Sequence, residues 1–271
     1  MTSRTELFQP RITPVAGRLQ SKVALVTGGA KGIGKAIAIR FAQEGADVVV
    51  TDRDARAGSE TADELRALGR KALSHPADVA DRSAIEAMVE SVLRDFSSID
   101  ILVNNAGIIV FGSLMQCRLE DWDRMLAVDL TGSFHCTQVV GQHMVKRGSG
   151  GRMIHIGSTA SLLPTAKQGA YCVAKAGLRM MSMMAAMELA PHGITSNLLC
   201  PQGAVTDINR ELLSDPAVMA KLEANIPAGR MAKTEEIAAA AAFLASEEAA
   251  YITGAELVHD GGSTISSVWR R

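Results

Sequence analysis

The sequence predicts an α/β fold, with one doubly wound parallel sheet of about seven strands that carries helices on both of its faces. From residue 22 onward, short runs of apolar and β-branched residues alternate with longer segments that have a helical pattern. The short runs are mostly apolar without alternation, which indicates strands buried on both faces, as in a parallel sheet. No linker rich in Gly, Ser or Pro divides the sequence and no repeat period is present, so a single domain is expected.

The alternation assigns each element in order. Strands are predicted at 23–26, 47–51, 71–74, 101–103, 152–156, 194–199 and 256–258. Helices are predicted between them, at 33–43, 55–68, 82–96, 119–146, 171–190 and 235–245. A helix that joins two parallel strands of one sheet makes a right-handed crossover, so these helices are expected to pack against the sheet.

Two segments depart from the alternation. Residues 1–20 contain Pro10 and Pro14 and lack the apolar core of a signal peptide, so we expect a surface tail before a single domain at 21–271. Residues 203–232 interrupt the rhythm after the sixth strand. Long excursions of this kind are usually functional, and ligands bind beyond the carboxyl ends of the strands in open α/β sheets. The segment is therefore interpreted as a substrate lid, with a passive surface loop as the alternative.

The composition argues against several classes of protein. A hydrophobic content of 47% and a formal net charge of -1 give no reason to expect binding to nucleic acid or to an anionic membrane. The cysteines show no C-x-x-C spacing, so neither a disulfide framework nor a metal site is expected from Cys117, Cys136, Cys172 and Cys200. Unpaired thiols fit a reducing compartment, and the most apolar helical stretch is too short to span a bilayer. The expected location is the cytoplasm.

A glycine-rich stretch, TGGAKGIG, lies between the first predicted strand and the first predicted helix. At such a junction the backbone N–H groups and the positive end of the helix point toward a ligand, and glycine lets a pyrophosphate approach the backbone. The spacing of Gly28, Gly32 and Gly34 differs from the common G-x-G-x-x-G fingerprint, and the glycines alone fit an ordinary turn as well. Asp52 ends the second strand about twenty residues downstream, where a carboxylate can accept ribose hydroxyls, and this favours a dinucleotide.

Asp52 also favours NAD over NADP. A 2′-phosphate about 4 Å from a carboxylate would be disfavoured by about 4 kcal/mol at an effective dielectric constant near 20. Lys31 and Arg53 would offset part of this repulsion by neutralising the phosphate, although Arg53 fits a solvated surface charge better. The predicted cofactor is therefore NAD.

Three further residues have the types and spacing that hydride transfer requires. Tyr171 and Lys175 lie four residues apart on one face of a predicted helix, and Ser158 follows the fifth predicted strand at the same sheet edge as the glycine turn. Oxidation of an alcohol needs a base, and a free tyrosine with a pKa of about 10 is a poor one at pH 7. An adjacent ammonium group stabilises the phenolate, and a serine hydroxyl can hold the substrate oxygen. A lone Y-x-x-x-K pair is common on surface helices, so only the combination indicates a site.

Together these motifs resemble the short-chain dehydrogenase/reductase family. The resemblance runs from about residue 19 to residue 262 and rests on TGGAKGIG, DVAD at Asp78, NNAG at 104–107, Ser158, YCVAK and two C-terminal stretches, PAGRMAKTEEIAAAAAFLAS and YITGAELVHDGG. The spacing of the three glycines is this family's form of the dinucleotide turn. The resemblance implies a Rossmann-type fold and a nicotinamide-dependent oxidoreductase.

The resemblance also implies a role for each matching residue. Tyr171 would be the acid/base, Ser158 would polarise the substrate oxygen, and Lys175 would bind the nicotinamide ribose and lower the pKa of Tyr171. The remaining cofactor-binding residues would be Gly28, Lys31, Gly32, Ile33, Gly34, Asp52, Asp78, Val79, Asn105, Ala106, Gly107, Pro201 and Thr206. A homotetramer or dimer is implied as well, because the methionine-rich helix at 180–187 would pack against another subunit.

Two positions depart from the family's pattern. Asp129 stands where the family usually has an asparagine that orients a water molecule to the lysine. Buried near Lys175, Asp129 is either ionised and paired with the lysine or protonated and similar to asparagine, and we expect reduced but present activity. Gln202 stands where glycine is usual, so a positive φ would be strained there; alternatively its side chain reaches the substrate.

The leading hypothesis is an NAD-dependent oxidoreductase that interconverts a secondary alcohol and a ketone. The substrate is a polyol, a sugar-derived alcohol, a hydroxysteroid or a hydroxyacyl compound, with a small polar alcohol slightly favoured because the predicted lid carries Asp207, Asn209 and Arg210. Asp129 motivates a second hypothesis, a non-catalytic dinucleotide sensor or scaffold. A Rossmann-like methyltransferase is disfavoured, since methyl transfer needs no such proton relay.

Overall fold

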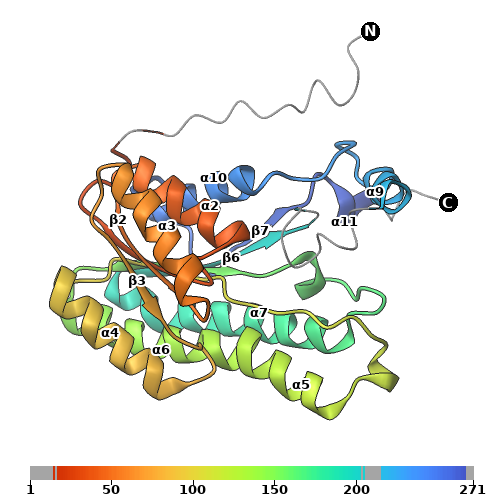
Figure 1. Cartoon of the computed structure of the whole chain (residues 1–271), viewed down its shortest axis with the longest axis horizontal. Helices are drawn as coiled ribbons and strands as arrows, with labels where there is room; N and C mark the ends of the chain where they lie inside the picture. The colour runs from red at the N-terminus through yellow and green to blue at the C-terminus, as the bar shows by residue number, and fades with distance from the viewer. Residues whose placement is uncertain (1–14, 16, 203, 205–214, 267–271) are drawn as a thin grey trace, which may run out of the picture.

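The computed structural model describes residue 15, residues 17–202, residue 204 and residues 215–266. Its sheet consists of seven parallel strands in the order β3-β2-β1-β4-β5-β6-β7 (Figure 1). The strands are β1 (Val23–Thr27), β2 (Asp47–Asp52), β3 (Ala72–Pro76), β4 (Ile101–Asn104), β5 (Gly151–Ile156), β6 (Ile194–Pro201) and β7 (Glu256–His259). The strand order reverses between β1 and β4, which confirms the predicted doubly wound α/β fold.

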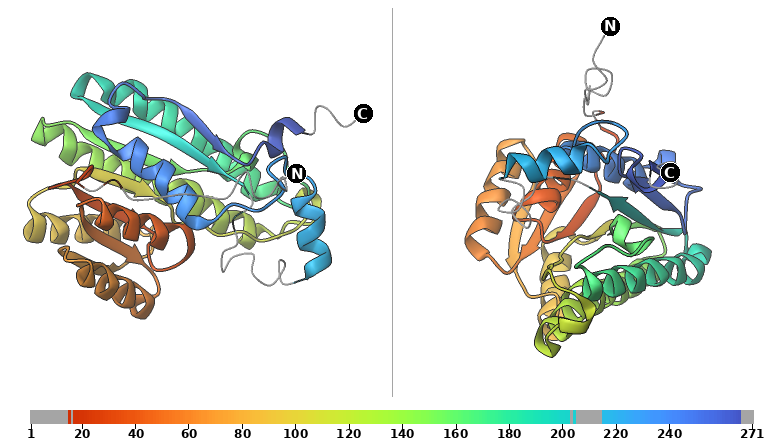
Figure 2. Two further views of the ribbon diagram at one scale, coloured as in Figure 1. Left: turned by 90° about the horizontal axis from the view of Figure 1, so that it is seen from above. Right: turned by 90° about the vertical axis from the view of Figure 1, so that its right-hand side faces the viewer.

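Helices cover both faces of the sheet, as the end-on view in Figure 2 shows. One layer contains α2 (Gly32–Gln43), α3 (Ala55–Ala67) and α10 (Thr234–Ala245). The other contains α4 (Arg82–Phe96), α5 (Leu119–Leu126), α6 (Ser133–Arg147) and α7 (Gly169–Leu189). The shorter elements are η1 (Leu114–Gln116), η2 (Ala127–Gly132), η3 (Thr159–Ser161), η4 (Ala190–His192), α9 (Pro216–Glu223), η5 (Glu247–Ala249) and α11 (Ser263–Ser266).

Each face of the sheet has its own hydrophobic core, and neighbouring residues of one strand point to opposite cores. In β1, Val26 packs in the core shared with Phe41 of α2, whereas Leu25 packs in the core shared with Met88 of α4 and Val140 of α6. All five residues of β1 are buried. Burial on both sides explains why the strand sequences are continuously apolar rather than alternating.

The helix predicted at 119–146 is not continuous. It is divided into α5 and α6 by a π-helical segment, η2 (Ala127–Gly132). Gly132 lies in this segment at a close approach, since a Cβ atom there would be 2.6 Å from Cγ2 of Val79. The apolar spacing on either side fits an ordinary helix, so the sequence did not reveal the interruption. Wide turns of this kind occur frequently at functional sites, and this one carries Asp129.

The two irregular segments differ partly from expectation. The predicted tail at 1–20 ends earlier, because Leu19 is fully buried in the core and Arg18 Nε lies 2.6 Å from Oε2 of the buried Glu44. The predicted lid at 203–232 contains α9, and a bridge between Ala204 and Ala232 joins its ends. Residues 203 and 205–214 of this segment, including Thr206, lie outside the described residues.

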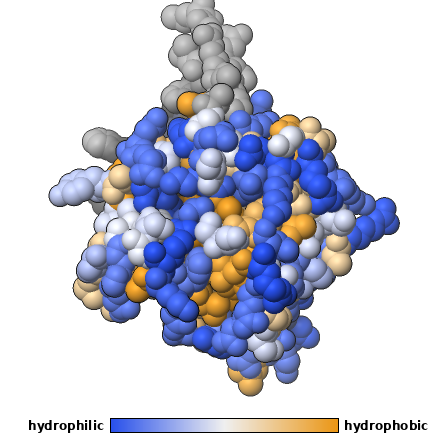
Figure 3. Space-filling view, turned by 90° about the vertical axis from the view of Figure 1, so that its left-hand side faces the viewer, coloured by the Kyte–Doolittle hydropathy of each residue, from blue (hydrophilic) through white to orange (hydrophobic). Residues whose placement is uncertain are grey.

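The surface bears on two expectations, the absence of a membrane-spanning helix and contact with a second subunit. In the described part of the chain, no helix is both long and apolar enough to cross a membrane. Figure 3 shows one face as a hydrophilic surface interrupted by apolar patches. On α7, Met180 and Met187 expose 54% and 66% of their surface, and Met183 and Met184 expose 38% and 44%. Exposed apolar side chains on one helix suit the predicted contact with a second subunit. Both the assembly and the cytoplasmic location stay predictions.

A chain of buried polar side chains crosses the central strands and ends on α7. Asn104 Nδ2 donates to Oγ1 of Thr137 (2.9 Å) and lies 3.1 Å from Nδ1 of His155. His155 Nε2 lies 3.1 Å from Oγ of Ser196, which in turn donates to the backbone carbonyl of Ser182 (2.9 Å). The Asn104 amide is a donor, so Nδ1 of His155 accepts and Nε2 carries the proton. Complete burial lowers the pKa of His155 to about 4, and the ring is therefore neutral.

This burial predicts a loss of stability in acid. His155 has a pKa of 6.5 when exposed and about 4 in the folded protein, so the unfolded chain binds its proton first as the pH falls. The contribution of neutral His155 to the free energy of unfolding is fully present above pH 6.5. It decreases by about 3 kcal/mol in total as the pH falls from 6.5 to 4. Urea unfolding at several pH values should show that His155→Gln removes this part of the pH dependence.

The exposed His192 provides the matched control for this measurement. The substitution His192→Gln should leave the pH dependence of the unfolding free energy as it is in the unaltered protein. An identical pH dependence for the unaltered protein and His155→Gln would contradict the assignment of a neutral, buried His155.

Candidate functional site

The site is a cavity of about 440 Å³ at the carboxyl edge of the sheet, where α/β proteins bind ligands. It brings together residues from the turns after β1, β2, β4, β5 and β6 and from the start of α7. The predicted site residues that line it are Gly28, Lys31, Gly32, Ile33, Asp52, Asn105, Ala106, Gly107, Asp129, Ser158, Tyr171, Lys175 and Pro201. Asp78 and Val79 line an adjoining cavity of about 110 Å³ instead. Gly34 lines neither, and Thr206 lies outside the described residues.

The glycine turn has a geometry that only glycine tolerates. Gly28 has a φ of 61°, in the left-handed region that other residues avoid. Gly34 does not face the cavity, but a Cβ atom there would be 2.2 Å from the backbone oxygen of Gly28. The third glycine therefore lets the start of α2 pack against the turn, while the first lets the chain bend sharply after β1. These are the properties that a dinucleotide turn requires.

The NNAG stretch holds the glycine turn from the neighbouring strand. Asn105 Nδ2 donates to the backbone oxygens of Thr27 (2.9 Å) and Gly28 (3.0 Å). The backbone N–H groups of Asn105 and Ala106 donate to Oγ1 of Thr27, at 2.9 and 3.0 Å. Thr27 was not singled out from the sequence, because its hydroxyl acquires partners only when β1 and β4 are adjacent.

The end of β2 presents a carboxylate to the same cavity. Asp52 is half-buried and accepts from the backbone N–H groups of Ala30 (3.3 Å) and Asp54 (3.1 Å). The nearby cations that were expected to neutralise a 2′-phosphate face acidic side chains. Lys31 Nζ lies 2.7 Å from Oδ2 of Asp54, and Arg53 Nη1 lies 3.9 Å from Oδ2 of Asp78. Arg124 Nη2 lies closer to the same oxygen of Asp78, at 2.7 Å. Among the described residues, Asp54 and Asp78 are thus paired with cations, whereas Asp52 forms no ion pair.

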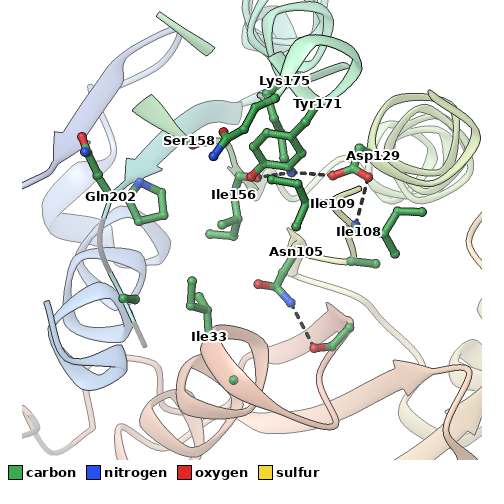
Figure 4. Close-up of a pocket in the computed structure, with 18 of the residues that line it drawn as sticks. Ile33, Asn105, Ile108, Ile109, Asp129, Ile156, Ser158, Tyr171, Lys175 and Gln202 are labelled. Carbon is green, nitrogen blue, oxygen red and sulfur yellow. Dashed lines mark hydrogen bonds and ion pairs between the residues drawn. The ribbon is translucent and has the colours of Figure 1, made fainter. Parts of the chain in front are cut away.

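Ser158, Tyr171 and Lys175 gather on the opposite wall, across the cavity from Ile33 and Asn105 (Figure 4). Ser158 is placed two residues beyond β5, where it begins the short helix η3 and its Oγ accepts from the N–H of Ala160 (3.1 Å). Tyr171 and Lys175 project from the first turns of α7, and Lys175 Nζ lies 5.5 Å from the centroid of the Tyr171 ring. The structure thus brings together the three residues predicted from the sequence.

Lys175 is held between two oxygen atoms in the interior. Its side chain is 5% exposed, and Nζ donates to the backbone oxygen of Ile156 (3.1 Å) and lies 3.2 Å from Oδ1 of Asp129. Asp129 is fully buried in the π-helical segment η2, and its Oδ2 accepts from the N–H of Ile108 (3.0 Å). Figure 4 shows Asp129 beside Lys175 on the side away from Gln202. Both alternatives for Asp129 fit this contact, because a carboxylate oxygen and the carbonyl oxygen of a protonated carboxyl group can each accept from the ammonium of Lys175.

Burial and charge act on these groups together. Burial raises the pKa of Asp129, and the charge of Lys175 and the N–H of Ile108 oppose that effect. For Lys175 burial acts to lower the pKa, but the carboxylate of Asp129 raises it above the ordinary value, so the ammonium stays charged. Burial raises the pKa of Tyr171; Lys175 and a hydrogen bond with Ser158 lower it, and Asp129 raises it further. Asp129 and Lys175 thus have opposite effects on the Tyr171 proton.

The structure adds lining residues that the sequence left unassigned. Ile156, Thr165 and Gln168 line the cavity beside the reactive groups, together with Ile108 and Ile109. None of these residues was assigned a role from the sequence. Gln202 also lines the cavity, and it is not among the described non-glycine residues with positive φ, which are Ser21, Ser97 and Lys167. The backbone strain considered for Gln202 is therefore absent.

The chain is similar to several characterised proteins over almost its full length. A family model described as enoyl-(acyl carrier protein) reductase matches residues 28–264. The chain is 40% identical to the D-threitol dehydrogenase of Mycolicibacterium smegmatis, covering 92% of this chain and 95% of the relative. It is 37% identical to glucose 1-dehydrogenase 2 of Bacillus subtilis, covering 91% and 96%.

Solved structures agree with the sequence matches. A gluconate 5-dehydrogenase from Burkholderia cenocepacia, in complex with NADP and tartrate, superposes with a TM-score of 0.88 at 34% identity, covering 92% of this chain and 98% of that one. A short-chain type dehydrogenase/reductase from Mycobacterium marinum superposes with a TM-score of 0.87 at 34% identity, covering 91% and 96%. With the glycine turn and the Ser158, Tyr171 and Lys175 group in place, these matches show that the chain belongs to the short-chain dehydrogenase/reductase family.

Proposed function

We propose that this protein is an NAD-dependent dehydrogenase that interconverts a secondary alcohol and a ketone. The observation that carries the proposal is the placement of Ser158, Tyr171 and Lys175 on one wall of the cavity, with the glycine turn and Asn105 on the other. The glycine turn fits a dinucleotide, because Gly28 and Gly32 line the cavity without side chains and leave the backbone there accessible to a pyrophosphate. When bound, the dinucleotide supplies the hydride acceptor or donor.

The residues of the chain would handle the proton and the substrate oxygen. The Ser158 hydroxyl donates a hydrogen bond to the oxygen of the reacting carbon and holds it near Tyr171. In alcohol oxidation the Tyr171 phenolate accepts the hydroxyl proton, and in ketone reduction the phenol returns it. Lys175 stabilises the phenolate by its charge, which Asp129 and the Ile156 carbonyl keep in place.

The proposed substrate is a small polyol or sugar-derived alcohol. Two relatives that share at least 37% of their residues with this chain are named for threitol and glucose. The cavity combines isoleucine side chains with glutamine and threonine side chains, so it can contact both carbon and hydroxyl groups. A non-catalytic sensor remains the alternative, and it differs by binding the dinucleotide without turning over any alcohol.

Replacing Tyr171 tests the catalytic assignment. Tyr171→Phe keeps the ring and removes the hydroxyl, so kcat for alcohol oxidation should fall by roughly 10²–10⁴-fold. Absorbance of the reduced nicotinamide measures turnover with a panel of polyols, and fluorescence titration of the dinucleotide checks that the cofactor still binds. Unchanged turnover in Tyr171→Phe would overturn the assignment, whereas cofactor binding without turnover in the unaltered protein would favour the sensor.

At position 129 this protein has a carboxyl group, which can carry a negative charge, where asparagine would place a neutral amide. A negative charge at Asp129 raises the pKa of Tyr171 and offsets part of the effect of Lys175. It therefore favours the phenol over the phenolate. We propose that alcohol oxidation requires a higher pH with Asp129 than it would with an uncharged residue at this position, because the phenolate of Tyr171 forms at a higher pH.

The substitution Asp129→Asn should move the pH profile. Asparagine keeps an oxygen toward Lys175 but removes the negative charge, so the pKa of Tyr171 should fall. The acidic limb of kcat/KM for oxidation should shift to lower pH, and the rate at pH 7 should be preserved or raised. Thermal unfolding checks that the variant is folded. A large loss of rate in the folded variant, or a shift of the acidic limb to higher pH, would contradict this role.

The preference for NAD is proposed from the carboxylate at the end of β2. Asp52 lines the cavity, and the neighbouring cations Lys31 and Arg53 face Asp54 and Asp78. A 2′-phosphate would therefore meet a carboxylate whose charge is not offset by a cation held beside it. A relative with the same fold is described in complex with NADP, so the fold alone does not exclude NADP and the proposed preference rests on local charge.

Asp52→Asn tests this electrostatic choice. The amide keeps an oxygen for the N–H of Ala30 and removes the charge, so the preference for NAD over NADP should decrease by about tenfold or more. The ratio of the two dissociation constants, measured by fluorescence titration, gives the result, and Asp63→Asn on the exposed side of α3 is the control. Equal affinities for NAD and NADP in the unaltered protein would contradict the proposed preference.

A further inference from the structure

Gln168 has an unusual position at the wall of the reactive cavity. It is half-buried, lines the cavity with Ser158 and Tyr171, and immediately precedes α7. Its backbone oxygen accepts from the N–H of Cys172 (2.8 Å), so the residue belongs to the first turn of the helix that carries Tyr171. The side chains of Gln168 and Tyr171 line the same cavity, so both can reach a molecule bound there.

The amide of Gln168 is not used by the protein itself. Its side chain forms no capping hydrogen bond at the start of α7, although the residue occupies the capping position. Within the described ranges, the side chain also has no hydrogen bond to any other residue. A half-buried amide without a protein partner can donate and accept hydrogen bonds toward a molecule in the cavity.

A strained turn fixes this residue in place. Lys167 has a φ of 60°, in the left-handed region, and its backbone oxygen accepts from the N–H of Gly112 (2.8 Å). A bridge pairs Gly112 with Gln168, so the turn is tied to the wall segment that contains Ile108 and Ile109. A non-glycine residue in this conformation costs about 1 kcal/mol or more, and such strain is concentrated near functional sites. The turn and the bridge therefore fix the backbone of Gln168 at the cavity wall.

The charges around the cavity limit what Gln168 can bind. Among its described lining residues the cations are Lys31 and Lys175, and these face Asp54 and Asp129. No cation of the described wall is thus left to pair with a substrate carboxylate or phosphate. An amide offers one donor group and one acceptor, which match a neutral hydroxyl. The isoleucine side chains would contact the carbon skeleton.

We propose that Gln168 binds a second hydroxyl of the substrate, on the carbon next to the reacting carbon, and so selects neutral vicinal diols over simple alcohols. The proposal rests on the proposed dehydrogenase function and names the substrate class of that site. Ser158 and Tyr171 hold the reacting oxygen, and Gln168, one helical turn before Tyr171, holds the neighbouring one. A bound simple alcohol has no second hydroxyl, so the donor and acceptor groups of the Gln168 amide would lack a partner in that complex.

Paired alcohols test the proposal on the full chain with NAD. Propylene glycol is compared with isopropanol, and cis-vicinal cyclohexanediol is compared with cyclohexanol, by kcat/KM from the absorbance of reduced nicotinamide. The substitution Gln168→Leu should lower kcat/KM for both diols by about tenfold and change the values for the simple alcohols by less than about twofold. Cofactor affinity and thermal unfolding should stay as in the unaltered protein.

Gln202→Leu is the matched control, because it removes an identical amide from the end of β6 in the same cavity. It should not distinguish diols from simple alcohols. Equal losses for diols and simple alcohols in Gln168→Leu would overturn the proposal for Gln168 and leave the dehydrogenase intact. Selective loss of the diols in Gln202→Leu alone would also overturn it. Failure of the unaltered protein to oxidise any of the four alcohols would reject the proposal for Gln168, and failure on the whole polyol panel as well would also reject the proposed function.

Discussion

The buried pair between Lys175 and Asp129 is the interaction on which the rest of the site depends. A lysine ammonium that is 5% exposed needs acceptor oxygens in the interior, because a buried charge without hydrogen-bond partners is costly. Asp129 and the Ile156 carbonyl provide the two partners, from η2 and from the end of β5. The pair therefore joins α7 to both neighbours and fixes the ammonium near Tyr171.

The surrounding structure is arranged to keep this pair in position. The π-helical turn η2 widens the helix between α5 and α6 where Asp129 accepts from Ile108, so the carboxylate and the wall segment after β4 are linked. On the other side, the buried chain from Asn104 through His155 and Ser196 reaches the backbone of Ser182 on α7. The helix that carries Tyr171 and Lys175 is thus anchored at its beginning by the Lys167 turn and at its middle by polar contacts under the sheet.

Several features could be predicted because they depend on local chemistry. Continuous apolar runs at β1 and β2 predict strands buried on both faces, and the glycine spacing predicts a turn with left-handed residues. Tyr171 and Lys175 share a helix face because of a four-residue spacing that no packing can change. Other features could not be predicted. The interruption at Asp129 and the hydroxyl of Thr27 acquire their roles from neighbours that are distant in sequence, on β4 and on the segment after it.

The sequence by itself determined the α/β fold, the glycine turn and the three residues proposed as reactive groups, because period, residue type and short spacing are local properties. The tertiary structure decided which charges lie beside each other: Asp129 with Lys175, Lys31 with Asp54, and Arg124 with Asp78. It also brought the amide of Gln168 to the cavity wall without a protein partner. Charge compensation and burial depend on distances between segments far apart in the chain, and only folding sets those distances.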